Sequence, residues 1–201
     1  MLRSTILTGA SNPPLFWGAR LSINWKITFH GLHTQDWRYD QLQEQSGAFF
    51  PVVNLFGIQI MPTLIVYACL LPGFTYILLG GGMNIFTIFC LILIFGSARF
   101  EMVADIQMQK FRQERGNRLE ILCSGLWRHS WHPNYLGEIT VWWGVYGVML
   151  SVTPELWYLG FGALANTCLF LFISIPLAED HLAEYKEGYE QYRQDTRLLL
   201  P

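Results

Sequence analysis

The chain contains few charged residues for its length. Of its 201 residues, 14% are Asp, Glu, Lys or Arg, whereas 52% are hydrophobic and 15% are aromatic. An average soluble domain has about 25% charged residues. The apolar residues also gather in long blocks, which is the pattern of membrane-spanning helices. The composition therefore indicates an integral membrane protein.

Other features that are absent narrow the range of functions. The formal net charge is −2, so no basic excess predicts a nucleic-acid partner. No histidine or cysteine spacing typical of metal ligation occurs, so no metal site is expected. The cysteines also lack the short paired spacing of a metal site or disulfide framework, and we interpret them as buried structural thiols. They are Cys69, Cys90, Cys123 and Cys168.

Four apolar stretches are long enough for a membrane span, which needs roughly 20 helical residues. We predict an all-α polytopic fold in which Pro72 and Gly73 end the first span. Glu138 is the only charged residue within a predicted span, apart from Glu155 at the first position of the fourth. Residues 49–201 form one predicted membrane domain. It follows a segment, 1–48, that contains a partial or interfacial helix at 15–29. The predicted spans are 49–71, 74–97, 133–152 and 155–177.

The basic residues predict the orientation of these spans. All 13 lie before Phe49, between Arg99 and Arg128, or after Leu177. With four spans these three regions share one side of the membrane, which the positive-inside rule makes the cytoplasmic or matrix side. The C-terminus is expected on that side, in a membrane that the sequence does not specify.

Two segments outside the spans, 98–115 and 176–197, are predicted as amphipathic cytoplasmic helices. Each has a polar stripe at helical spacing, for which a solvated helix face is the simplest interpretation. The stripes consist of Glu101, Asp105, Gln109 and Arg112 in the first helix, and Tyr185, Tyr189 and Tyr192 beside Arg193 in the second.

The segment 125–143, GLWRHSWHPNYLGEITVWW, carries the densest set of chemically useful side chains. Pro133 suits the first turn of a helix, where free N–H groups and the helix dipole favour an anionic group. Asn134 and Glu138 are four residues apart and share a face, with Tyr135 beside them. An ionisable residue at the mouth of a span indicates a functional site. A first-turn carboxylate stabilised by the helix dipole is the structural alternative.

These residues resemble a known family. Gly-Leu-Trp-Arg followed by His-Pro-Asn-Tyr-Leu-Gly-Glu at 132–138 is similar to the C-terminal signature of the steroid 5α-reductase superfamily, especially its bacterial-type branch. The resemblance covers residues 15–201 and is most specific from Arg99 onward. Asp105 and Arg112 resemble the cofactor-contacting pair of that family. Its C-terminal helix is similar to Pro176-Leu177-Ala178-Glu179, Gly188-Tyr189 and Tyr192-Arg193, with Leu200-Pro201 at the end.

The resemblance implies an NADPH-dependent reductase that acts on a C=C bond in a lipophilic, sterol-like or isoprenoid-like substrate. The expected partners are this substrate, membrane lipids and other membrane subunits. By the same resemblance, Arg112 and Arg193 would bind phosphates through their guanidinium groups. The implied cofactor-binding residues are Asp105, Arg112, Asn134, Tyr135, Glu138, Tyr189 and Arg193.

The sequence also departs from the family pattern Arg-Tyr-(Ser/Thr)-Arg-His-Pro. His129 replaces the tyrosine and Trp131 replaces the second arginine. The family generally has further helices before the part that matches Leu15, and one of them supplies a substrate-polarising Glu, so no catalytic residue is assigned here. Two alternatives stay open: a non-catalytic structural or lipid-binding subunit of a larger membrane complex, and an S-adenosylmethionine-dependent membrane methyltransferase.

Overall fold

The computed structural model of the protein describes Gly18, Ser22, Lys26 and residues 37–117, 119–186 and 188–199. The predicted partial helix at 15–29 lies outside the described residues except for those three positions, as does most of the segment 1–48. Within the described part, every regular element is a helix, apart from one isolated parallel bridge between Ser130 and Arg197. The predicted all-α fold is confirmed.

The first long helical run, Trp37–Leu78, passes through the predicted first span. The prediction that Pro72 and Gly73 end this helix is wrong, because Pro72 lies inside it. The chain instead turns at Gly80 and Gly81, whose positive φ angles of 83° and 49° suit glycine. An interior proline is tolerated in a membrane helix when neighbouring groups satisfy the freed carbonyl. The run consists of α2 Trp37–Ser46, η1 Gly47–Phe49, α3 Phe50–Val52, the π-helical segment η2 Val53–Ile60, and α4 Met61–Leu78.

Helix α5, Ile85–Glu114, begins later than the predicted second span at 74–97. Its start is set by a capping box, in which Asn84 Oδ1 accepts from Thr87 N at 2.9 Å and Thr87 Oγ1 accepts from Asn84 N at 3.3 Å. The helix then continues without a break to Glu114, so the predicted cytoplasmic extension is helical.

The predicted third span corresponds to α6, Pro133–Leu150, and the fourth to a continuous helical run. Three helical runs are long and apolar enough to cross a membrane: Trp37–Leu78, Ile85–Glu114 and Pro154–Glu184. Helix α6 is not among them, and more than half of its residues are buried against its neighbours. The last run consists of η4 Pro154–Gly160, α7 Phe161–Leu169, the π-helical segment η5 Phe170–Ser174, and α8 Ile175–Tyr185.

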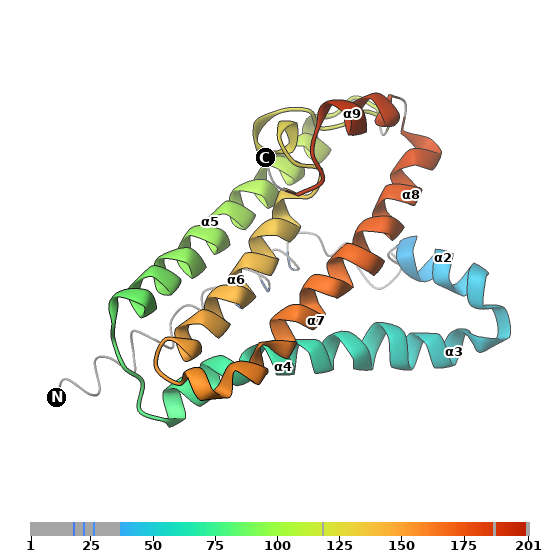
Figure 1. The fold of residues 1–201 in the computed structure, drawn as a ribbon. Coiled ribbons are helices and arrows are strands. Elements are labelled where there is room, and N and C mark those ends of the chain that lie inside the picture. The colour runs from blue at the N-terminus through green and yellow to red at the C-terminus, as the bar shows by residue number, and fades with distance from the viewer. Residues whose placement is uncertain are drawn as a thin grey trace.

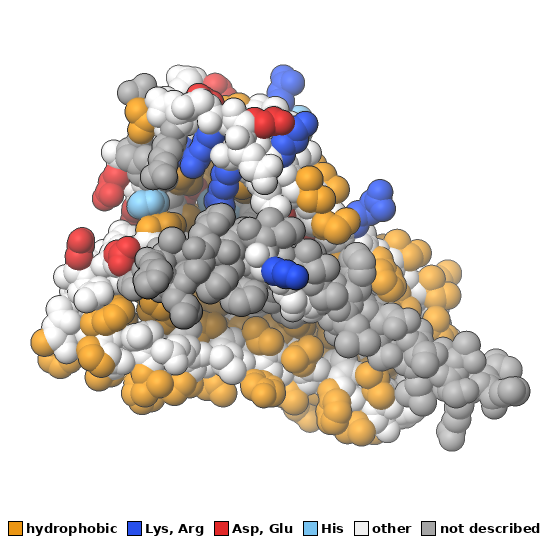
Figure 2. All heavy atoms as spheres, turned by 180° about the vertical axis from the view of Figure 1, so that it is seen from behind, with side chains coloured by type: hydrophobic (Ala, Val, Ile, Leu, Met, Phe, Trp, Pro, Cys, Tyr) orange, Lys and Arg blue, Asp and Glu red, His pale blue; other side chains and the backbone are white. Residues whose placement is uncertain are grey.

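Helices α5 and α6 lie side by side (Figure 1). Helix α4 packs across the C-terminal end of α6 and the N-terminal end of α7, at the end of the molecule far from the C-terminal end of α5. The core between these helices includes Cys69, Cys90, Trp142 and Met149. Two cysteines are therefore buried as predicted, whereas Cys123 and Cys168 are exposed, contrary to the prediction. Figure 2 shows hydrophobic side chains covering the part formed by α3 and α4, which is the surface expected against lipid.

The predicted helix at 176–197 is interrupted. Helix α8 ends at Tyr185, and α9, Tyr189–Asp195, begins after Gly188, whose φ of 75° lies in the left-handed region. The break begins at Lys186, whose φ of −95° and ψ of 117° are extended, and the left-handed Gly188 then forms the N-cap of α9. Helix α9 consequently folds over the end of the molecule where α5 and α8 end (Figure 1).

Candidate functional site

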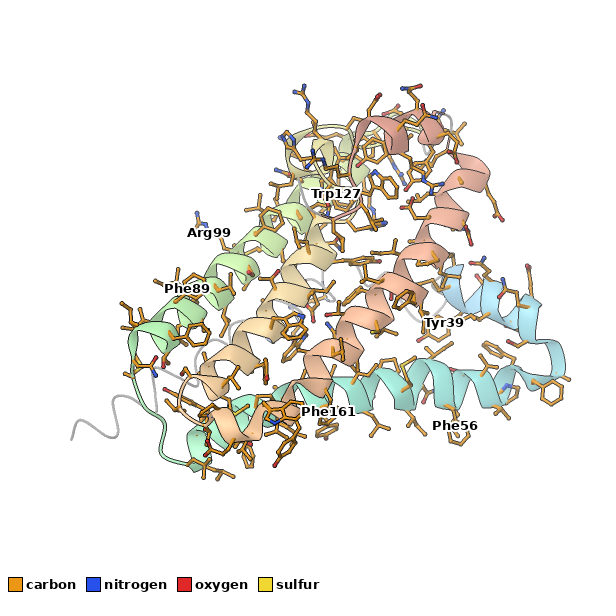
Figure 3. The ribbon with its side chains drawn as sticks, in the orientation of Figure 1. Tyr39, Phe56, Phe89, Arg99, Trp127 and Phe161 are labelled. Atoms are coloured by element: carbon orange, nitrogen blue, oxygen red, sulfur yellow. The ribbon has the colours of Figure 1, made fainter. Side chains whose placement is uncertain are left out.

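The loop before α6 is fastened to α5. Its 3-10 turn, η3 Gly125–Arg128, begins at a glycine whose φ is 61°. Leu126 N donates to Gln107 Oε1 at 2.9 Å, and the buried Trp127 indole donates to the Ala104 carbonyl at 3.1 Å. Trp127 thus points into the space enclosed by this loop (Figure 3). These bonds set His132 and the start of α6 beside the C-terminal half of α5.

A buried carboxylate, Glu179 on α8, is the centre of a polar network. Its Oε1 atom lies 2.7 Å from His132 Nε2 and accepts from the Tyr189 hydroxyl at 2.6 Å, while Oε2 lies 3.3 Å from Arg193 Nε. Burial, and then the hydrogen bond to Glu179, raise the pKa of Tyr189 well above its ordinary value, so it remains a protonated donor. The network joins the start of α6 to α8 and α9.

Arg193, a predicted phosphate ligand, is held within the protein on several sides. Its guanidinium lies 5.1 Å from the centre of the Trp131 ring, and Nη1 lies 3.3 Å from Glu190 Oε1. Trp131 is itself fixed by a 2.9 Å bond from its indole to the Thr196 carbonyl. The tryptophan that departs from the family pattern therefore supports an arginine of the C-terminal helix.

The first turns of α6 carry three of the predicted cofactor residues. The Tyr135 ring stacks on His132, at a centroid distance of 4.9 Å, and lies tilted against Phe170, at 4.7 Å. Glu138 Oε1 accepts from the Trp142 indole at 2.8 Å. Asn134 Oδ1 is buried and accepts no hydrogen bond from any residue that the structure describes. An acceptor of this kind normally has a partner, so Asn134 has the capacity to bind a ligand donor.

Close approach of α5 places further carboxylates beside α6. A Cβ atom at Gly137 would lie 2.6 Å from Glu101 Cβ, so only glycine allows the two helices to pack as they do. Glu101 is buried, which excludes the predicted solvated face for this residue. Asp105 follows one turn later and is half-buried.

Three cations gather where α5 ends. Lys186, between α8 and α9, donates to the Glu120 carbonyl at 2.5 Å. Its pKa is lowered from the ordinary value by burial and then by the positive charges of Arg115 and Arg112. No carboxylate lies within ion-pair distance of Arg112 or Arg115 in the described part of the chain. Glu120 opposes this lowering of the Lys186 pKa, but the positive charges at this end of α5 outnumber it, and such a group of cations is suited to a polyanion.

The structure thus divides the seven predicted residues into three neighbouring sets. Asn134, Tyr135 and Glu138 lie on the first turns of α6, and Asp105 and Arg112 lie on α5. Tyr189 and Arg193 contact Glu179. Sequence reasoning did not assign His132, Glu179, Arg115 or Lys186 to the site. His132 and Glu179 are polar residues next to apolar segments, and this position is the sequence signal that could have assigned them to the site. Nothing in the sequence pairs Lys186 with the end of α5.

Comparisons with known proteins place the chain in a family. No curated protein and no solved structure matches it. Among the residues described by the structure, no group of three or more His, Cys, Asp or Glu side chains could hold a metal ion. One family model matches residues 7–196, nearly the whole chain. The chain therefore belongs to the family described as "Protein of unknown function (DUF1295)".

Proposed function

We propose that the protein is an NADPH-dependent membrane reductase of the steroid 5α-reductase superfamily, reducing a C=C bond in a lipophilic, sterol-like or isoprenoid-like substrate. The observation that carries this proposal is the buried Asn134 Oδ1, an acceptor without a donor in the described part of the chain. A nicotinamide carboxamide supplies an N–H donor, and so fits this atom. Glu138, one turn further along α6, lies on the same face.

The phosphate end of the cofactor fits the three cations at the end of α5. Arg112 and Arg115 supply guanidinium forks, and Lys186 supplies a compact ammonium. Burial lowers the pKa of Lys186 first, and the positive charges of Arg115 and Arg112 lower it further against the opposing charge of Glu120. Several phosphate charges would compensate all three. Arg193 serves in this proposal chiefly to position α9, because it already contacts Glu179, Glu190 and Trp131.

The remaining residues prepare the site for chemistry. When bound, NADPH supplies a hydride to the β-carbon of an activated C=C bond. Tyr135, whose ring stacks on His132 and lies tilted against Phe170, gives an aromatic wall next to Asn134. The Glu179 network holds this wall and α9 together, which limits the access of water.

Binding of NADPH to the detergent-solubilised protein, followed by nicotinamide fluorescence, tests the proposal. Arg112→Ala should weaken binding by about tenfold to a hundredfold, because a charge-assisted contact contributes about 1.5–3 kcal/mol. Asn134→Ala should weaken it less, by about twofold to tenfold. Lys110→Ala is the matched control: it removes a cation from the same helix, but one that is 71% exposed and paired with Glu114.

The alternatives give different results in the same titration. Absence of NADPH binding to the intact protein would contradict the proposal and favour a non-catalytic subunit of a membrane complex. Saturable binding of S-adenosylmethionine without NADPH binding would favour a methyltransferase. Equal effects of Arg112→Ala and Lys110→Ala would show that the phosphates bind elsewhere.

The affinity for NADPH should also depend on pH through Lys186. Because the free protein lowers the pKa of this lysine, it loses its proton below the ordinary value of 10.5. Bound phosphates favour its charged form, so affinity should be full at neutral pH and fall as pH rises through the lowered pKa. Lys186→Arg remains charged over this range and should retain its affinity. An identical pH profile for both proteins would exclude Lys186 from the site.

A further inference from the structure

Helix α7 contains a buried polar side chain that the proposed cofactor site does not use. Asn166 is 5% exposed, and its Nδ2 atom donates to no acceptor in the described part of the chain. It lies inside the run Pro154–Glu184, which is long and apolar enough to span the membrane. An unsatisfied buried amide in such surroundings is unfavourable in free energy. A ligand that supplies an acceptor would recover this energy.

Asn166 lies one turn beyond the point where α7 touches α4. A Cβ atom at Gly162 would be 2.4 Å from the carbonyl carbon of Ala68, so the two backbones are in contact there. From this crossing, near Phe161 in Figure 3, the two helical runs diverge toward α8 and α3 (Figure 1). The amide is therefore placed where the separation of the two runs begins.

The local helix geometry is irregular on both sides of this divergence. The run containing α4 has a π-helical segment at Val53–Ile60, and the run containing α7 has one at Phe170–Ser174. Such segments widen a helix and frequently occur at functional sites. Phe170 at the start of the second one lies tilted against Tyr135 of the candidate cofactor site.

The buried face of α7 also adjoins the polar face of α6. Ala163, one turn before Asn166, shares a core cluster with Trp142, whose indole donates to Glu138. Asn166 and Ala163 are on the same face of α7, as their burial and spacing indicate. The amide thus belongs to the interface that carries Glu138.

We propose that Asn166 Nδ2 donates a hydrogen bond to the carbonyl oxygen of an apolar substrate bound beside α7. This inference rests on the proposed reductase function and supplies the substrate-polarising group that sequence resemblance left unassigned. The hydrogen bond withdraws electron density from the C=C bond conjugated to the carbonyl and stabilises the oxygen as it becomes an enolate. No proton leaves Asn166 in this step: the hydride adds to the β-carbon, the π electrons of the C=C bond move toward the carbonyl oxygen, and water supplies the proton that the α-carbon takes up when the ketone re-forms.

The test uses β-ionone, an apolar isoprenoid enone, and the hydrocarbon of the same skeleton in which a methylene replaces the ketone. Binding to the detergent-solubilised full chain is followed by tryptophan fluorescence. The natural protein should bind the ketone about tenfold more tightly than the hydrocarbon. Asn166→Leu should bind the two ligands with equal affinity. The carbonyl stretch of bound β-ionone should shift to lower wavenumber only when Asn166 is present.

Two further measurements separate this role from a structural one. Asn166→Leu without ligand should unfold at the same temperature as the natural protein or higher, because it removes an unsatisfied buried amide. Its affinity for NADPH should be unchanged, so failure at Asn166 is distinguishable from failure of the cofactor proposal. Equal ketone binding by both proteins, or a lower unfolding temperature for Asn166→Leu, would overturn the inference.

Phospholipid esters also carry carbonyl oxygens, and repeating the titration in phosphatidylcholine nanodiscs distinguishes them from the substrate. In nanodiscs we expect the natural protein still to bind the ketone more tightly than the hydrocarbon. Loss of this preference there, with the preference retained in detergent, would assign Asn166 to a bound lipid and overturn its role toward a substrate.

Discussion

Replacing Glu179 with alanine is expected to destabilise the protein by about 2–4 kcal/mol, because the buried His132 and Tyr189 lose their common acceptor and Arg193 loses a buried counter-charge. Since Arg193 is 37% exposed, water compensates part of its loss. At roughly 2–4 °C per kcal/mol, the unfolding temperature in detergent should fall by about 4–16 °C. Circular dichroism during heating measures it.

Glu190→Ala is the matched control for this prediction. Glu190 lies at the same 3.3 Å from the Arg193 guanidinium, but its side chain is 70% exposed, against 7% for Glu179. An exposed pair contributes about 0–1 kcal/mol, so the unfolding temperature should barely change. Similar losses for the two variants would mean that Arg193, rather than the buried network, governs the attachment of α9.

The second large effect is expected at Gly162, where α7 touches α4. In Gly162→Ala the new Cβ would lie 2.4–2.6 Å from backbone atoms of Ala68 and Cys69, which cannot move aside as a side chain can. Overpacking of this kind costs about 1–3 kcal/mol or more, and here it exceeds the gain in helix propensity. The helices should separate, lowering the unfolding temperature and weakening the binding of β-ionone.

Gly96→Ala separates packing from helix propensity. Gly96 is an exposed helical glycine of α5, and a Cβ atom there would meet nothing within 4 Å. This variant should be unchanged or more stable by about 0.5–1 kcal/mol, because alanine costs less conformational entropy in a helix. A loss at Gly96 as large as that at Gly162 would contradict the proposed contact of α4 with α7.

Helix boundaries show where local patterns mislead. Pro72-Gly73 is a strong local stop signal, yet Pro72 is fully buried inside α4 and Gly73 faces Val145 of α6. Tertiary packing outweighs proline's preference, and the helix ends instead before the glycines at 80–82. Conversely, periodicity alone extends a helix to Arg197, but extended backbone at Lys186 and the left-handed Gly188 interrupt it, because spacing carries no information about the backbone conformation of single residues.

The candidate site shows a similar division. The sequence could assign Asn134, Tyr135 and Glu138 to one site, because neighbouring turns of one helix keep them close together however the other helices pack. Glu179 could not be joined to His132, 47 residues away, because that pairing depends on where α8 lies relative to α6. Lys186 and Arg115 come together for the same reason.

The sequence by itself determined that the protein is an all-α membrane protein with a polar site at the start of α6, because apolar length and helical spacing are local properties. Tertiary structure alone decided which charges are neutralised, which cations stay together, and which buried amides lack partners. These outcomes depend on contacts between distant segments, and small residues such as Gly137 and Gly162 set how closely those segments approach.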